Sequence, residues 1–451
     1  MTIMPAAFDS SRGDRIMQRS KRIWWLVVGI VAVLPVGWRM LTWQRFRPVN
    51  VDPAMASAGD ELFHHQWKAG EGKDPLSPDG DGLGPVFNAT SCVACHNQGA
   101  PGGGGSLENN VTTFSLRVAG QKPREGVVHA RASKREYQET LRDVHPELPA
   151  VSQPTLAQLL PSTSRGAQVG QSGRQLIAMP PGVVVSQVNP PALFGSRLID
   201  AVPDRILIAA EKTQRIKWGN APTGKDELPV GRASRMPDGR IGKFGWKAQT
   251  ATLSDFVQAA CANELGLGNP GQPQPTPLGK PGYKPRGLDL TQEQCDQITA
   301  YVAWLDTPTE RTPVELKDQV DASAGKKLFG TVGCADCHTP NLGSIEGIYS
   351  DLLLHRMSVE MVGAGAYYEV AVPVPDTTAG PAPSEWRTPP LWGVADSAPY
   401  MHDGRAATLE DAIRMHGGQG KKSAERFGEL KEHEQKQVIA FLKTLRAPGA
   451  K

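Results

Sequence analysis

The sequence predicts a mainly α-helical protein in which two tandem domains of related sequence follow an N-terminal transmembrane helix. Three observations lead to this prediction: a five-residue motif that occurs twice, longer segments that repeat around it, and an apolar run near the N-terminus. A chain of 451 residues is long enough for each domain to bury its own core. The abundance of glycine (48) and proline (38) predicts many loops and few strands.

The apolar run covers residues 23–43, and Arg39 is the single charged residue within it. The run is nearly long enough to span a bilayer, and its tryptophans suit the membrane interface. Basic residues in the tail 1–22 favour a cytoplasmic N-terminus, which places the rest of the chain on the periplasmic side of the inner membrane. A signal peptide cleaved near Ala54-Met55-Ala56 is the alternative, but those small residues lie far beyond the apolar run. We expect an uncleaved single-pass anchor.

The repeated motif is Cys-X-X-Cys-His, which begins at Cys92 and again at Cys334. Its two thiols lie one helical turn apart and form thioethers with the vinyl groups of haem, and its histidine is the proximal iron ligand. A zinc knuckle or a redox thiol pair is the alternative for a single Cys-X-X-Cys, but two copies that both end in histidine favour haem. The motifs predict two covalently bound haem c groups held by Cys92, Cys95, His96, Cys334, Cys337 and His338.

Segments upstream and downstream of the motifs also repeat. The sequence ASAGDELF at 56–63 returns as ASAGKKLF at 322–329, in each case shortly before the motif. Further along, FGWKAQTATLSDF at 244–256 parallels YMHDGRAATLEDA at 400–412, which sets Trp246 opposite His402. The repeat predicts two cytochrome c-like domains that arose by duplication.

Each domain ends in an amphipathic helix, expected at 290–305 and at 430–445. A linker rich in threonine and proline, around residues 306–313, separates them, so the domains are predicted at 51–310 and 311–451. His96 and Trp246 are 150 positions apart, whereas the corresponding His338 and His402 are 64 apart. The first domain therefore carries long insertions, which we expect to be ordered surface loops or lids.

His416 is the candidate sixth ligand of the second haem, because it ends the helix expected from Thr408 and precedes Gly417-Gly418. A capping histidine at a helix C-terminus is the alternative. Further candidates for that iron are His355, Met357 and Met415.

The repeat places Ala260 opposite His416, so the first haem is expected to have an open position. The nearby Glu264 would act there as an acid or base for O–O bond cleavage, unless it is an ordinary glutamate at a helix end. Ligation of the first iron by another histidine would close the site, and the candidates are His64, His65 and His129.

Trp246 is either an electron relay between the haems or a tryptophan of the core.

The remaining cysteines, Cys261 and Cys295, are expected to form a disulfide that contributes roughly 3 to 4 kcal/mol, or alternatively a reactive redox pair. Lys plus Arg (49) nearly balances Asp plus Glu (46), with no basic block that would indicate nucleic-acid binding.

The residues at 387–393 and 400–410 resemble the bacterial di-haem cytochrome c peroxidase superfamily, which includes the maturation enzyme MauG. Within it, residues 82–90, 244–249 and 350–355 are similar to the di-haem oxidoreductase family of peroxidase-like proteins. The resemblance covers about residues 56 to 446 and implies that the C-terminal haem transfers electrons. The family's distal ligand of that haem, Met or Tyr, falls at His416 here.

The resemblance also implies that Trp246 lies between the haems and that Glu264 approximates the distal glutamate of the peroxidatic haem. The gated histidine that the peroxidases carry soon after the first motif has no counterpart in the glycine-rich segment 97–106. We therefore expect an exported, peroxidase-like di-haem oxidoreductase that uses hydrogen peroxide or another small oxidant and a cytochrome or cupredoxin donor. The alternatives are an electron-transfer cytochrome without catalysis and MauG-like oxidation of a protein partner. A bound calcium ion is left open.

Overall fold

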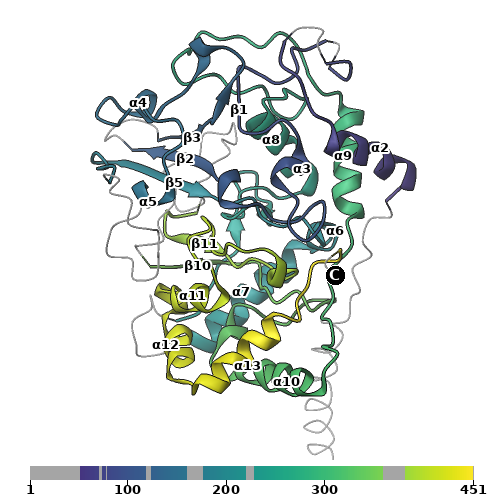
Figure 1. The fold of residues 1–451 in the computed structure, drawn as a ribbon, viewed down its shortest axis with the longest axis vertical. Helices are drawn as coiled ribbons and strands as arrows, with labels where there is room; N and C mark the ends of the chain where they lie inside the picture. The colour runs from purple at the N-terminus through teal and green to yellow at the C-terminus, as the bar shows by residue number, and fades with distance from the viewer. Residues whose placement is uncertain are drawn as a thin grey trace, which may run out of the picture. The chain divides into compact units, whose positions relative to one another are not determined.

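The computed structural model describes residues 51–70, 74–77, 79–117, 123–159, 176–219, 228–358 and 381–449. The predicted tail 1–22 and transmembrane anchor 23–43 lie outside these residues. In the part of the chain that the structure describes, no helix is both long and apolar enough to cross a membrane. The fold is mainly helical with some sheet (Figure 1), as the sequence predicts.

Each half of the chain is closed by a pair of packed helices. In the first half α2 (Pro53–His64) lies against α9 (Gln292–Trp304), and in the second α10 (Leu316–Thr331) lies against α13 (Glu432–Leu442), as Figure 1 shows. The first helix of a half therefore packs on its last helix. This is the arrangement expected of a duplicated domain.

Two glycines of the repeated ASAG sequence allow these helices to cross closely. A Cβ atom on Gly59 would lie 1.9 Å from the carbonyl oxygen of Gln297, and one on Gly325 would lie 1.8 Å from that of Gln437. Any larger residue would force the helices apart. An aromatic pair lies beside each crossing, Phe63–Tyr301 in the first half and Phe329–Phe441 in the second.

The second repeated segment forms a tight turn followed by a helix. Bridges between Phe244 and Thr250 and between Tyr400 and Ala406 close the two turns. Helices α8 (Leu253–Leu265) and α11 (Leu409–Arg414) follow, each N-capped by a threonine hydroxyl that accepts the third backbone N–H of its helix, at 3.1 Å in both.

The insertions of the first half contain a three-stranded antiparallel sheet of order β3-β2-β5, formed by β2 (Val111–Leu116), β3 (Arg124–Val128) and β5 (Val183–Val188). Thr113 lies opposite Val127 on one side and Ser186 on the other. Phe114 packs beneath the sheet against α4 (Leu141–Val144). The abundance of glycine and proline predicts loops in these insertions, but the β-branched segments form strands because they bury a small core of their own.

The remaining elements are short and connect the features above. The other helices are α3 (Cys92–Cys95), α5 (Leu156–Leu159), α6 (Ser196–Asp200), α7 (Asp204–Trp218) and α12 (Lys421–Glu429). The paired strands are β1 (Val86–Phe87) with β4 (Arg131–Ala132), β6 (Ser234–Arg235) with β7 (Ile241–Gly242), β8 (Asn341–Leu342) with β9 (Ile345–Glu346), and β10 (Leu354–Arg356) with β11 (Glu385–Arg387).

Candidate functional site

The first Cys-X-X-Cys-His motif forms the one-turn helix α3 and ends at His96, the residue that follows it. The Nδ1 atom of His96 lies 3.3 Å from the carbonyl oxygen of Gly103 and 3.1 Å from that of Pro191. These bonds assign the ring proton to Nδ1 and leave the lone pair of Nε2 for a ligand. Orientation of this kind by a backbone carbonyl is typical of histidines that bind metals.

The second motif forms a 3₁₀ turn at Cys334–Asp336 and then places His338 in the same way. The Nδ1 atom of His338 lies 3.0 Å from the carbonyl oxygen of Tyr349. Burial lowers the pKa of His96 to about 4. Burial, helped by the neighbouring His416, also lowers the pKa of His338 to about 4. Both rings are therefore neutral at physiological pH, which is the form that binds a metal.

His416 follows α11 and faces His338. Its Nδ1 atom lies 2.7 Å from the carbonyl oxygen of Ala412, and burial lowers its pKa, so its Nε2 atom is also available as a ligand. The centroids of the two rings are 6.5 Å apart, with 65° between the ring planes. Imidazole nitrogens bind first-row metals at about 2 Å, so two rings on opposite sides of one iron have centroids roughly 6 Å apart. The pair has the spacing of a bis-histidine site.

The first cavity lies beside His96 and is lined by apolar side chains from α8 and α9. Ala260 and Glu264 also line it. Among the described residues in its lining there is no histidine besides His96 and no methionine. The second cavity is lined by His338 and His416 together. The two cavities thus differ in the number of histidines that they offer to an iron.

Glu264 lies at the C-terminal end of α8 and is held by Asn88. The amide nitrogen of the Asn88 side chain donates to Oε2 of Glu264 at 2.6 Å, and the backbone N–H of Asn88 donates to the Glu264 carbonyl at 2.7 Å. Asn88 precedes the first motif by four residues. The carboxylate is therefore fixed in the wall of the first cavity by the segment that leads to Cys92.

Trp246 lines both cavities and so forms part of the wall between them. Its Nε1 atom donates to the carbonyl oxygen of Asn189 at 2.8 Å, which fixes the orientation of the indole. His402, its counterpart in the repeat, lines the second cavity alone.

None of the three other histidines proposed for the first iron lines the first cavity. His64 is largely exposed and bonds Asp60 of its own helix. His65 bonds Asp74 through Nε2 at 3.0 Å. His129 is buried and uses both ring nitrogens in hydrogen bonds. Of the residues proposed for the open side of the first iron, Glu264 is the one that lines this cavity.

The predicted disulfide between Cys261 and Cys295 is wrong for this structure, in which both residues are buried free thiols. Burial raises the pKa of Cys295 to about 12 and that of Cys261 well above its ordinary value. Helices α8 and α9 pack together at these positions, so the two side chains serve as small apolar residues of the helix interface.

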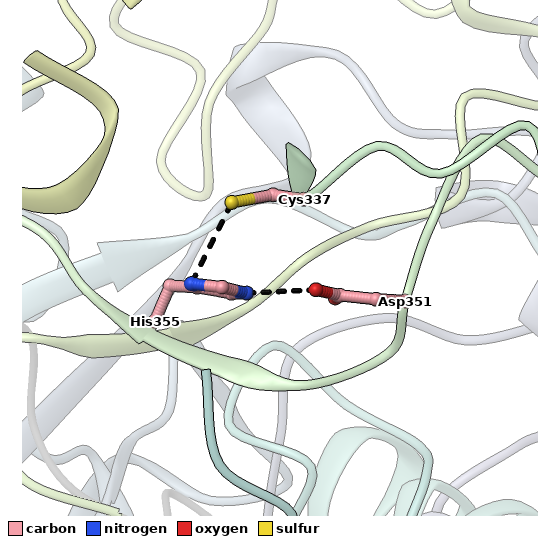
Figure 2. A group of neighbouring side chains, drawn as sticks. All are labelled: Cys337, Asp351 and His355. Atoms are coloured by element: carbon pink, nitrogen blue, oxygen red, sulfur yellow. Dashed lines mark hydrogen bonds and ion pairs between the residues drawn. The ribbon is translucent and has the colours of Figure 1, made fainter. Parts of the chain in front are cut away.

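Cys337, Asp351 and His355 lie within reach of one another (Figure 2), and they are the one group in the described chain whose ligand atoms are close enough to share an ion. His355 bonds Asp351 through Nε2 at 2.8 Å and lies 3.6 Å from Sγ of Cys337 through Nδ1. Gln214 also donates to Asp351 at 2.7 Å. Because the Cys337 thiol belongs to the second motif, we interpret the group as contacts that stabilise the segment carrying this motif.

The residues around the second cavity fit a haem. His402 is buried there, stacked on Trp386 with 3.7 Å between ring centroids, and neither of its ring nitrogens has a hydrogen-bond partner among the described residues. Its Nε2 atom lies 3.7 Å from the carboxylate of Asp403. Burial lowers the pKa of His402 to about 3. A neutral buried ring without partners fits a cavity whose occupant brings its own polar groups.

A protein-family model described as "Di-haem oxidoreductase, putative peroxidase" matches residues 190–445, which is more than half of the chain. The chain belongs to this di-haem oxidoreductase family. The matched region contains the second motif, Trp246, Glu264 and His416, but the first motif lies before it.

Relatives with assigned names share smaller regions. MauG of Methylorubrum extorquens is 30% identical over 139 residues, 29% of this chain and 36% of MauG. The cytochrome c551 peroxidase of Nitrosomonas europaea is 32% identical over 130 residues, 28% and 34% of the two chains. The matches thus span about a third of the length of these relatives. The solved di-haem peroxidase BthA of Burkholderia thailandensis aligns over 89% of this chain and 87% of its own, with 15% identity and a TM-score of 0.38.

Sequence reasoning missed the residues of this family member that orient the site. Asn88 holds Glu264, Asn189 holds Trp246, and backbone carbonyls of Gly103, Pro191 and Tyr349 hold the histidines of the two motifs. A backbone carbonyl leaves no signal in the sequence. Asn88 lies in the segment 82–90 that carries the family resemblance, but nothing in that segment indicates its contact with Glu264.

Proposed function

We propose that the chain is a di-haem peroxidase that reduces hydrogen peroxide to water at the His96 haem, with electrons that enter through the haem between His338 and His416. The observation that carries the proposal is the asymmetry of the two cavities. The second offers a histidine on both sides, whereas the first offers His96 and a carboxylate. A haem with both axial positions filled transfers electrons, and one with an open position binds a substrate.

Cys92 and Cys95 would hold the first haem, and Cys334 and Cys337 the second. When bound, the haems supply the redox chemistry by which peroxide takes up two electrons and two protons and yields two water molecules. Glu264 would accept a proton from one peroxide oxygen and return it to the other, which leaves as water. Asn88, which donates to the carboxylate at 2.6 Å, would keep it oriented for both transfers.

Trp246 would conduct electrons from the second cavity to the first, since it is the aromatic side chain of the shared wall whose ring is fixed by Asn189. The membrane anchor at 23–43, the periplasmic location of the haem domains and a cytochrome or cupredoxin donor belong to the same proposal. They rest on the sequence, because covalent haem attachment and an apolar run after a basic tail indicate an exported, tethered protein.

The test is electron paramagnetic resonance of the oxidised and half-reduced protein, followed by peroxide addition with reduced cytochrome c as donor. We expect one low-spin and one high-spin haem, together with turnover. Glu264→Gln should lower kcat/KM for peroxide roughly 100-fold or more, because it removes the proton acceptor. The matched control is Glu432→Gln, an exposed residue of α13 whose carboxylate is paired with Lys436. Two low-spin haems without turnover would contradict the proposal and favour a simple electron-transfer cytochrome.

A further inference from the structure

A buried ion pair lies behind Glu264 and outside the first cavity. It joins His129, which follows β3, to Glu139, and their side chains are 4% and 1% exposed. Both residues come from the insertions of the first half and precede residue 190, where the match to the family model begins. The pair is thus a feature that the matched family region does not supply.

The hydrogen bonds of His129 fix its protonation state. Its Nδ1 atom lies 2.8 Å from Oε2 of Glu139, and its Nε2 atom lies 2.9 Å from the carbonyl oxygen of Asn263. Both carboxylate oxygens of Glu139 accept backbone N–H groups, Oε2 from His129 and Oε1 from Leu278, so the carboxylate acts as an acceptor at both oxygens. Two acceptors face the two ring nitrogens, and the ring must carry a proton on each. His129 is therefore an imidazolium.

The electrostatics agree with this assignment. Burial disfavours the charged ring, but the negative charges of Glu139 and Glu264 and the hydrogen bonds to Glu139 and Asn263 outweigh it and raise the pKa of His129. The charge of Glu264 acts on His129, and the imidazolium acts equally on Glu264. Arg131 of β4 is a second cation of this region, since it and Glu264 both shift the pKa of Cys95.

Two connections join His129 to Glu264 mechanically. The carbonyl that accepts from Nε2 of His129 belongs to Asn263, the residue before Glu264. On the other side, the Asn88 side chain accepts the backbone N–H of Ala130 at 2.9 Å and donates to the Glu264 carboxylate at 2.6 Å. The segment 129–130 thus holds the carbonyl of the residue before Glu264 directly and the Glu264 carboxylate through one amide.

We propose that the His129 imidazolium, held by Glu139, is a positioning residue that fixes Glu264 and keeps its carboxylate ionised in the resting protein. The inference rests on the proposed function, because it assigns Glu264 as the base that accepts the peroxide proton. A cation behind the carboxylate opposes its protonation. The inserted segment that carries His129 would then have a functional role, because it sets the pH range over which the Glu264 carboxylate can accept a proton.

The test uses cyanide and the fully oxidised full-length protein, and it needs no turnover. Hydrogen cyanide must lose its proton when it binds a ferric haem, so the association rate should fall at acid pH as Glu264 becomes protonated. His129→Gln retains a neutral donor and removes the charge. A carboxylate that loses a nearby cation has a higher pKa. The acid limb, the part of the rate–pH profile in which cyanide binding slows as the pH falls, should therefore move to higher pH. At a pH on this limb we expect the variant to bind cyanide several-fold more slowly than the wild type.

The matched control is His145→Gln in the same insertion, whose ring accepts the backbone N–H of Glu147. It should follow the wild-type profile, and Glu264→Gln should abolish the acid limb. Glu139→Gln is the second variant if His129→Gln does not fold. It removes the anion that holds the imidazolium, so it should shift the limb in the same direction.

A correctly folded His129→Gln or Glu139→Gln protein with the wild-type limb would overturn the inference and leave the proposed function intact. A wild-type protein whose first haem binds no cyanide would overturn the proposed function as well. The two failures are distinguished by the wild-type profile alone.

Discussion

The two halves of the chain share one framework and differ at the positions that face their cavities. Gly59 and Gly325 make the same helix crossing, and Thr252 and Thr408 cap equivalent helices. Within that framework Ala260 stands in the first cavity where His416 stands in the second. The packing residues recur in both halves, whereas these two cavity positions differ in whether they offer a ligand atom. Two domains of one framework can therefore offer different ligand sets without a change of fold.

The largest expected effect comes from removal of the ligand that distinguishes the second half. His416→Ala should convert the C-terminal haem from low-spin to high-spin, while both haems remain covalently attached. Electron paramagnetic resonance and mass spectrometry of the intact protein measure the two results. The exposed His433→Ala in α13 serves as the control. An unchanged low-spin signal would move the ligand to His355 or Met357, which also line the second cavity.

A second prediction concerns the wall that joins the halves. Trp246→Phe keeps an aromatic ring but loses the hydrogen bond to Asn189, so the orientation of the ring is no longer fixed. We expect a several-fold slower electron transfer from the C-terminal haem during peroxide reduction, measured by stopped-flow absorbance, with unchanged spin states. Trp304→Phe, at a residue that is 51% exposed, should have no effect. Equal rates for both variants would show that electrons take another route.

The shared framework makes a third prediction. Gly59→Ala and Gly325→Ala should each destabilise the protein by about 1 to 3 kcal/mol, because the added Cβ meets a carbonyl oxygen of the partner helix. Thermal unfolding measures this. In the same helix as Gly325, a Cβ on Gly330 meets no atom within 4 Å, so Gly330→Ala should be neutral or slightly stabilising. If all three variants unfold alike, the close crossings are not what holds the halves together.

The smallest expected effect is at the helix caps. Thr252→Ala and Thr408→Ala each remove the hydroxyl that accepts the N–H of Asp255 or Asp411, which should cost about 1 kcal/mol in either half. Chemical denaturation of both variants compares the costs. Matched serine variants retain the hydroxyl and should regain most of the loss. A large loss of unfolding free energy in one half alone would mean that the two caps do not stabilise their halves equally.

Local sequence patterns predicted much of this structure. The aligned segments set Gly59 opposite Gly325, and the two glycines do make equivalent helix crossings, against Gln297 and Gln437. The same alignment set Ala260 opposite His416, and both do line their cavities.

What the sequence did not predict depends on contacts between distant segments. Asn88 and Glu264 are 176 positions apart in the sequence, and no local sequence pattern predicts a hydrogen bond between residues so far apart. Cys261 and Cys295 were paired by elimination, since four of six cysteines belong to the motifs, yet they remain thiols in an apolar interface. The sheet that presents His129 was missed because glycine and proline around it suggested loops. Composition describes a segment on average, whereas its packing depends on a few side chains.

The crossing of α2 with α9 also bears on how this chain was able to grow. The first helix of this half packs on its last helix, so the two ends of the half are held together. A segment inserted between them is a loop whose two ends are already fixed. Lengthening such a loop is thermodynamically cheap, since each doubling costs only about 0.6 kcal/mol of closure entropy. Extra segments can therefore accumulate beside a working redox centre and be recruited later to adjust its chemistry.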